Sequence, residues 1–377
     1  MENLITWVGV DDHKVELVVA VLREGEKEAE IATVPNEDGA LRRWVRRLVR
    51  NAGGGEIRIC YEAGPNGFAL KRRLESMGPV VCEVIAPTLT PRRSGVRVKT
   101  DPRDAGTLVK LYRAGELTEI GVPELEDEAA RDLTRLHHQV SREKLRKQHH
   151  ILKFLTRRGR IYLGRNWTEM HRRWICELPW EQEADRVALD ELLSGLGELE
   201  ARLSRLNEAV GHLAEEESRA YVVAVLRCFY GIDTLAAVSL VTEIFNIGRF
   251  AEPRRLMGYL GCTSRVRQTG GKEVRGSITK AGNSYARWML VQIAWHYRHP
   301  AVVGAKLRKR RVGQPAWAVE IADRAHRRLH RRFLRLRSRG KPVHKVVMAV
   351  ARELIGFLWE AMHEARRRQG RGLGKAA

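Results

Sequence analysis

The chain has 377 residues, which is long enough for two or three domains. It carries 68 Lys and Arg residues against 46 Asp and Glu, and the formal charge of +22 indicates a polyanionic partner. Charge alone does not separate DNA, RNA and an anionic membrane surface. No run of residues approaches the roughly 18 apolar residues of a membrane span, and the five cysteines lack zinc-ligand spacing. We expect a soluble cytoplasmic protein.

The first part of the chain alternates strand-like and helix-like segments. Two β-rich runs at 5–10 and 16–22 flank the polar residues 11–14, which predicts a hairpin, and 30–34 follows as a third strand. A helix around 41–48, a strand at 57–61, a helix at 68–77 and a strand at 80–85 come next. With a further helix from Asp101, this is the order of an RNase H-like α/β domain, although other α/β folds share parts of it.

Beyond residue 126 the pattern changes to long helices. Apolar residues recur at alternating spacings of three and four, which predicts the seam of a coiled coil. They are Leu189, Leu192, Leu196, Leu199, Leu203, Leu206, Val210 and Leu213. Ala129, Leu133, Leu136 and Val140 begin a less regular pattern that would pair with it. An intramolecular helical hairpin and a dimerisation arm both remain open.

The last two regions carry features suited to phosphate. Gly231-Ile232-Asp233 resembles a helix-hairpin-helix turn, whose backbone amides can hold a phosphate. From residue 301 the chain is basic and helical, and its arginines form a stripe without compensating acids, which favours phosphate contact over a merely solvated face. The stripe comprises Arg324, Arg327, Arg328, Arg331, Arg332 and Arg335. We expect the tail 366–377 to be disordered.

Four acidic residues occupy positions that an RNase H-like sheet would bring together. Asp11 and Glu62 end the first and fourth strands, which are neighbours in such a sheet, and Asp101 and Asp104 begin a helix. Carboxylates gathered in this way repel one another unless they share Mg²⁺ or Mn²⁺. Ordinary interpretations also exist: Asp11 as a turn residue with Asp12 as its rival, Glu62 as an exposed strand end, and Asp101 as a helix N-cap.

At this point the motifs resemble those of a known family, the DEDD transposases of bridge-RNA-guided insertion sequences, which include Piv-type DNA invertases. The N-terminal likeness rests on Gly9-Val10-Asp11 with Lys14, on Tyr61-Glu62-Ala63-Gly64, and on 98–105 with Asp101 and Asp104. The C-terminal likeness rests on Tyr259-Leu260-Gly261, Gln268-Thr269-Gly270-Gly271-Lys272, 276–283, Arg287, Gly340-Lys341-Pro342 and 346–359. It extends over nearly the whole chain in the same order.

The resemblance implies a RuvC-like catalytic domain over 1–124, a helical coiled-coil arm over 125–216, a transposase domain over 217–300, and a basic helical extension with a disordered tail over 301–377. Asp11, Glu62, Asp101 and Asp104 become the metal site. The implied partners are double-stranded DNA, a structured guide RNA and further copies of the chain, in a nucleoid-associated protein. Strand exchange would pass through a covalent link between a serine and DNA.

The chain departs from the family pattern at the nucleophile. Counting between Tyr259 and Ile278 places Thr269 where the family has serine. Threonine has the required hydroxyl, but its extra methyl stiffens χ1 and crowds the approach to phosphorus. Thr269 is therefore a working nucleophile, or Ser264 or Ser277 replaces it, or strand exchange is impaired; Thr269 as a simple cap of a glycine turn also remains open.

Basic residues near this turn and in the stripe are candidate nucleic-acid contacts, namely Lys272, Lys280, Arg287, Arg328 and Arg332. Two other functions compete with an RNA-guided recombinase. One is a RuvC-like metal-dependent nuclease that uses water as the nucleophile, and the other is a non-enzymatic nucleic-acid scaffold that relies on charge and the coiled coil.

Overall fold

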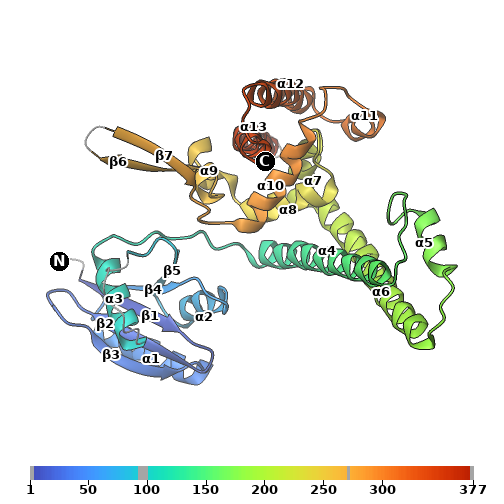
Figure 1. The fold of residues 1–377 in the computed structure, drawn as a ribbon. Coiled ribbons are helices and arrows are strands. Elements are labelled where there is room, and N and C mark those ends of the chain that lie inside the picture. Colours follow the sequence, from blue (N-terminus) through green and yellow to red (C-terminus); the bar gives the residue numbers. More distant parts are fainter. Residues whose placement is uncertain (1–3, 92–100, 270–271, 374–377) are drawn as a thin grey trace. The chain divides into compact units, whose positions relative to one another are not determined.

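The computed structural model describes residues 4–91, 101–269 and 272–373, and omits the side chains of 267, 269, 272, 273, 275 and 370–373. The motif residues 98–100, Gly270 and Gly271 lie outside the described residues. Two compact units make up the chain, Met1–Val122 and Pro123–Ala377. The first is a mixed α/β unit around a central sheet and the second is largely helical (Figure 1), in agreement with the expected fold class.

The first unit contains a five-stranded sheet in the order β3-β2-β1-β4-β5. Its strands are β1 (Ile5–Asp12), β2 (Glu16–Leu22), β3 (Glu30–Pro35), β4 (Glu56–Glu62) and β5 (Val81–Ile85). β1, β2 and β3 pair antiparallel, whereas β1 and β5 both run parallel to β4. The predicted hairpin and the predicted contact between the first and fourth strands are both confirmed.

Helices cover both faces of this sheet, and the alternation of side chains along the strands decides which face each residue joins. On β2, Leu17, Val19 and Val21 share a core with α1 (Asp38–Asn51) and α2 (Ala69–Met77). The intervening Val18, Ala20 and Leu22 pack with Ala105 and Val109 of α3 (Asp101–Arg113). The sheet is therefore covered on both faces, which explains why the inner strand β2 is a nearly continuous apolar run.

The second unit begins with a helical hairpin of α4 (Leu125–Arg157) and α6 (Glu183–Glu215), with the short α5 (Glu169–Cys176) between them. The helices are antiparallel, because contacts on α6 move backwards as those on α4 advance: His137 Nε2 meets Asn207 Oδ1 at 2.9 Å, and Lys144 Nζ meets Glu200 Oε1 at 2.9 Å. Within one chain, the apolar seam of α6 thus has α4 as its partner. The expected seam of α4 was wrong in part, because Leu136 is exposed and Thr134 and His137 are buried instead.

The remaining helices, apart from the short α11 (Ala305–Arg311), contribute to one hydrophobic core that extends from Val210 to Ala365. The helices of this core are α7 (Glu217–Leu226), α8 (Thr234–Ile244), η1 (Ile247–Arg249), α9 (Pro253–Tyr259), α10 (Ser284–His296), α12 (Ala316–Ser338) and α13 (Val343–Leu373). A two-stranded hairpin of β6 (Ser264–Thr269) and β7 (Lys272–Ile278) interrupts them (Figure 1). Sequence reasoning missed these strands, although a Gly-Gly pair between two β-rich runs is a hairpin signal.

The expectation of a disordered tail was wrong for residues 366–373, because α13 continues to Leu373, whereas residues 374–377 lie outside the described part of the chain. Glu364 Oε1 lies 2.6 Å from Arg367 Nη2 and 2.6 Å from Arg368 Nε, and such ion pairs one turn apart stabilise a helix. Ala365 is fully buried and anchors this part of the helix in the core. Among the described helices, none is long and apolar enough to cross a membrane.

A buried histidine gives the second unit a specific pH dependence. His326 is 2% exposed and stacks on Tyr230 with 4.2 Å between ring centroids, and burial, followed by the nearby Arg311, lowers its pKa to about 4. In the unfolded chain a histidine titrates near 6.5, so the unfolded state takes up the proton first as the pH falls. The stabilisation by neutral His326 is complete above pH 6.5 and is lost between there and about pH 4.

We therefore expect His326→Phe, which keeps the ring stack but does not titrate, to flatten the fall in Tm between pH 6.5 and 4. The difference between parent and variant should reach about 3 kcal/mol across this range. Thermal unfolding of both proteins at closely spaced pH values measures it, with His149→Phe on the exposed surface of α4 as the control. Parallel stability curves for parent and His326→Phe would contradict the assignment.

Candidate functional site

A close contact between a strand and a helix positions the acidic residues of the first unit. A Cβ on Gly9 of β1 would lie 2.7 Å from the carbonyl oxygen of Ala105 and 2.7 Å from the backbone nitrogen of Val109. Only glycine allows α3 to approach β1 this closely. Any larger residue at this position would push α3 away from the sheet.

This contact also sets which residues meet. Asp11 lies two residues after Gly9 and therefore on the same face of β1, about 7 Å along the strand. Asp101 lies four residues before Ala105, about 6 Å towards the start of α3. The distance from Gly9 to Asp11 along β1 is similar to the distance from Ala105 to Asp101 along α3, so the two aspartates lie side by side. Asp101 is at the N-terminal end of the helix, where the helix dipole favours carboxylates.

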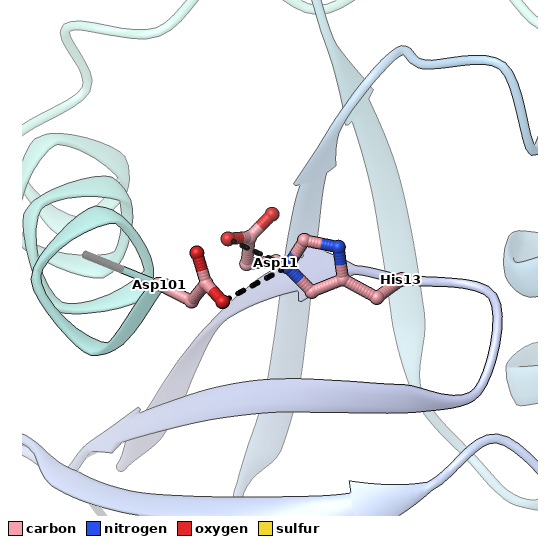
Figure 2. Close-up of side chains that lie close together, drawn as sticks. All are labelled: Asp11, His13 and Asp101. Atoms are coloured by element: carbon pink, nitrogen blue, oxygen red, sulfur yellow. Dashed lines mark ion pairs between the residues drawn. The ribbon is translucent and has the colours of Figure 1, made fainter. Parts of the chain in front are cut away.

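His13 lies between the two aspartates (Figure 2). Its Nε2 atom is 3.4 Å from Asp11 Oδ2 and 3.4 Å from Asp101 Oδ2. One ligand atom from each of the three residues falls within a common distance of 4.8 Å, a grouping that could hold a metal ion. Sequence reasoning treated His13 as part of a polar turn; because β1 ends at Asp12, strand alternation does not predict the direction of the His13 side chain.

Glu62 and Asp104 complete the expected acidic set by register. The last β1–β4 pair is Val10 with Tyr61, so Glu62 is the next residue on the strand beside Asp11. Residues that are level on neighbouring strands project to the same face, with the strands about 4.8 Å apart. Asp104 lies three residues after Asp101 and is half-buried on the same side of α3. The common group of three ligand atoms does not include either residue.

Asp12, the rival of Asp11, lies on the opposite face of β1. Burial raises the pKa of its carboxyl, and its Oδ1 atom is buried without a hydrogen-bond partner among the described residues. The neighbouring Asn66 donates to the Asp12 backbone carbonyl at 3.0 Å. Asp12 is therefore separated from Asp101 by the strand itself, and the structure favours Asp11 as the member of the cluster.

In the second unit, the candidate hydroxyls are distributed along the β6–β7 hairpin. Thr269 pairs with Lys272 next to the tip, and Ser264 pairs with Ile278 at the base. Ser277 is exposed one residue from that base. Thr269 lies five residues along the strand from Ser264, or about 17 Å, so these hydroxyls cannot serve the same point of a bound substrate. The side chains of Thr269 and Lys272 lie outside the described residues.

The base of the hairpin is tightly locked to α9 and α10. A Cβ on Gly261 would lie 2.1 Å from the Ala281 carbonyl oxygen, and one on Gly282 would lie 2.1 Å from the Tyr259 carbonyl oxygen. Both glycines have positive φ angles of 64° and 79°. The Arg287 guanidinium donates to the Leu260 carbonyl at 3.0 Å, so it holds this loop, whereas the Lys280 side chain is exposed.

A buried carboxylate connects this base to the arm. Glu243 on α8 is fully buried and accepts from Arg135 of α4 through both oxygens, at 2.7 and 2.9 Å. Its Oε2 also accepts from Asn283 Nδ2 at 2.6 Å, and Asn283 caps α10 by accepting from the Ala286 amide. Charge-assisted, bidentate pairs of this kind fix geometry strongly. Glu243 thus joins α4, α8 and the hairpin base.

The arginine stripe on α12 is not free of compensating acids, contrary to the expectation. Arg328 and Arg332 both pair with Glu353 of α13, the latter at 3.7 Å, and Arg324 pairs with Glu360. These partners are 21 to 36 residues distant in sequence, so helix periodicity within α12 does not reveal them. The exposed Arg327, Arg331 and Arg335 keep the stripe basic. At the other predicted turn, Asp233 caps α8 by accepting from the Ala236 amide at 2.9 Å.

Two family models match separate parts of the chain. The DEDD transposase model of the IS110 type, described as "Transposase", matches residues 8–158, and the model "Transposase IS116/IS110/IS902 family" matches residues 223–306. The chain is 39% identical to "Putative transposase y4qE" of Sinorhizobium fredii over 364 residues, which is 96% of this chain and 89% of the relative. The chain belongs to the IS110/IS116/IS902 transposase family.

The similarity to a second relative covers almost the full length of both chains. The transposase of insertion sequence element IS1533 from Leptospira borgpetersenii is 30% identical over 347 residues, or 90% of this chain and 99% of the relative. The first family match contains Asp11, His13, Glu62, Asp101 and Asp104, and the second contains the β6–β7 hairpin. The chain is thus a DNA transposase with a DEDD catalytic domain, and its family indicates dependence on a divalent metal.

Proposed function

We propose that this transposase is an RNA-guided, site-specific recombinase that cleaves and exchanges DNA strands to move an insertion sequence. Its first unit would be an RNase H-like domain of the RuvC type, an assignment supported by the strand order β3-β2-β1-β4-β5 with only β3-β2-β1 antiparallel. The observation that carries the proposal is the convergence of Asp11 and Asp101 on one point at the sheet edge. A non-enzymatic scaffold would have no need of this arrangement.

The residues at this edge suit Mg²⁺ or Mn²⁺. Asp11, Glu62, Asp101 and Asp104 offer hard oxygen donors, and their mutual repulsion would favour a shared cation. When bound, such ions would activate an attacking oxygen and stabilise a leaving one in phosphoryl transfer. The chain itself contributes the rigid placement of the carboxylates, through the fit of α3 against Gly9.

The Thr269 hydroxyl would be the nucleophile. Its Oγ1 atom would form a bond to phosphorus, the bond from phosphorus to one deoxyribose oxygen would break, and that oxygen would leave as a hydroxyl after taking up a proton. Attack by the deoxyribose hydroxyl of another strand would reverse these steps and release Thr269. The position of Thr269 supports this role, because it forms the last strand pair, with Lys272, at the end of β6 farthest from the hairpin base.

The partners would be double-stranded DNA and a structured guide RNA, in agreement with the net charge of +22. Lys272, Lys280, Arg328 and Arg332 stay candidate phosphate contacts, while the existing contacts of Arg287 favour a structural role. A homo-oligomer is also part of the proposal. Since α4 packs along α6 and Leu189, Leu196 and Leu199 are already buried, contacts between subunits would involve the parts of the arm that remain exposed.

The metal centre is tested by a pair of adjacent substitutions. We expect Asp11→Asn to reduce DNA cleavage by more than about 100-fold. Substitution of residues that only contact metal ligands typically costs up to about 100-fold, and loss of a ligand should cost more. Asp12→Asn, which removes the same charge on the opposite face of β1, should retain cleavage. Gel assays on labelled element ends, with and without chelator, measure both effects. Cleavage that survives Asp11→Asn or chelation would refute the proposed centre.

The nucleophile is tested by trapping protein–DNA adducts under denaturing conditions. Thr269→Ala should abolish the adduct, and Thr269→Ser should keep it because serine retains the hydroxyl and lacks the crowding methyl. Ser264→Ala and Ser277→Ala serve as matched controls within the same hairpin. If Thr269→Ala still hydrolyses DNA at the parent's rate without any adduct, the protein acts as a RuvC-like nuclease with water as its nucleophile.

The guide RNA is tested by sequencing the nucleic acid that co-purifies with the full chain from its host. We expect one discrete structured RNA encoded beside the transposase gene, and loss of strand exchange after ribonuclease treatment. Adding back the same RNA as a transcript should restore exchange, while a scrambled transcript of equal length should not. Recovery of only mixed cellular RNA, with exchange unaffected by ribonuclease, would count against RNA guidance.

A further inference from the structure

We infer that His13 is a ligand of the metal centre and that its nitrogen makes the centre prefer Mn²⁺ over Mg²⁺. The inference rests on the proposed function, since it adds a residue to the proposed carboxylate site. It concerns the one group of described residues whose ligand atoms lie close enough to share an ion, namely Asp11, His13 and Asp101. His13 is the only nitrogen donor in that group.

The distances between the three ligand atoms are close to those between neighbouring ligands of one ion. His13 Nε2 lies 3.4 Å from an oxygen of each aspartate, which is beyond the usual 2.7–3.2 Å range of an N–H···O hydrogen bond. Neighbouring ligands of an octahedral ion with bonds of about 2.1 Å are roughly 3 Å apart. Figure 2 shows the imidazole nitrogen directed at the space between the two carboxylates.

Stability does not explain the convergence. The side chains of His13 and Asp101 are 46% and 52% exposed, and ion pairs this exposed contribute little to folding. The backbone already holds the turn in place: the His13 carbonyl accepts from Asn36 Nδ2 at 2.9 Å, and the Val15 carbonyl accepts from the Asn36 amide at 2.8 Å. The imidazole is therefore free of any part in shaping the turn, and replacing it should leave the backbone intact.

The donor type sets the choice of ion. Mg²⁺ is bound in proteins almost entirely through oxygen and keeps several waters, whereas Mn²⁺ suits carboxylate oxygen and, as a first-row transition ion, also gains affinity from a nitrogen ligand. An imidazole inserted between two aspartates adds affinity for Mn²⁺ and little for Mg²⁺. The four acidic residues alone would not produce that discrimination.

The test is Mn²⁺ binding to the full chain after removal of metals, followed by electron paramagnetic resonance, with Mg²⁺ affinity measured by competition. We expect the bound Mn²⁺ of the parent to show nuclear modulation from one imidazole ¹⁴N, and His13→Gln to lose it. The variant should bind Mn²⁺ about tenfold more weakly and Mg²⁺ within about threefold of the parent. His149→Gln, an exposed histidine on α4, should match the parent in every respect.

The outcomes separate this inference from the proposal beneath it. If the parent does not bind Mn²⁺, or if Asp11→Asn binds it equally well, the proposed carboxylate centre is refuted. If Mn²⁺ binds in an Asp11-dependent way without ¹⁴N modulation, or if the modulation survives in His13→Gln, the centre stands and His13 is not its ligand. As a control for folding, His13→Gln should have the same Tm as the parent in thermal unfolding.

Discussion

The catalytic half of this transposase depends on one steric constraint, the absence of a side chain at Gly9. Because nothing projects from β1 at that point, α3 lies directly on the strand, with the Ala105 carbonyl and the Val109 amide against it. Residues on both elements are then fixed in pairs, and the end of the strand meets the beginning of the helix. The acidic cluster is thus a consequence of backbone packing, and loops contribute only the turn that carries His13.

Local patterns in the sequence were enough to predict the sheet and the meeting of Asp11 with Asp101, because strand alternation and parallel pairing of neighbours follow simple rules. They were not enough for His13, since a histidine in a polar turn has no periodicity to mark its direction. The same limit explains Glu353 and Glu360, which neutralise arginines of α12 from a different helix. Tertiary partners of charged residues are invisible to patterns within one element.

The β6–β7 hairpin illustrates an intermediate case. Glycines and a threonine pointed to a turn, and the count between Tyr259 and Ile278 located Thr269, but the flanking strands were not recognised within a mostly helical region. They matter for chemistry because they hold the threonine far from both serines. Thr269 therefore lies near the tip of the hairpin, whereas Ser264 and Ser277 lie near its base.

Glu243 gives the second unit a mechanical property. Arg135 of the long helix α4 and Asn283 at the root of the hairpin both bond to this one buried carboxylate, and neither water nor another residue can easily replace it there. The three side chains hold α4, α8 and the start of α10 together, so the position of the hairpin base depends on a residue of the long arm helix.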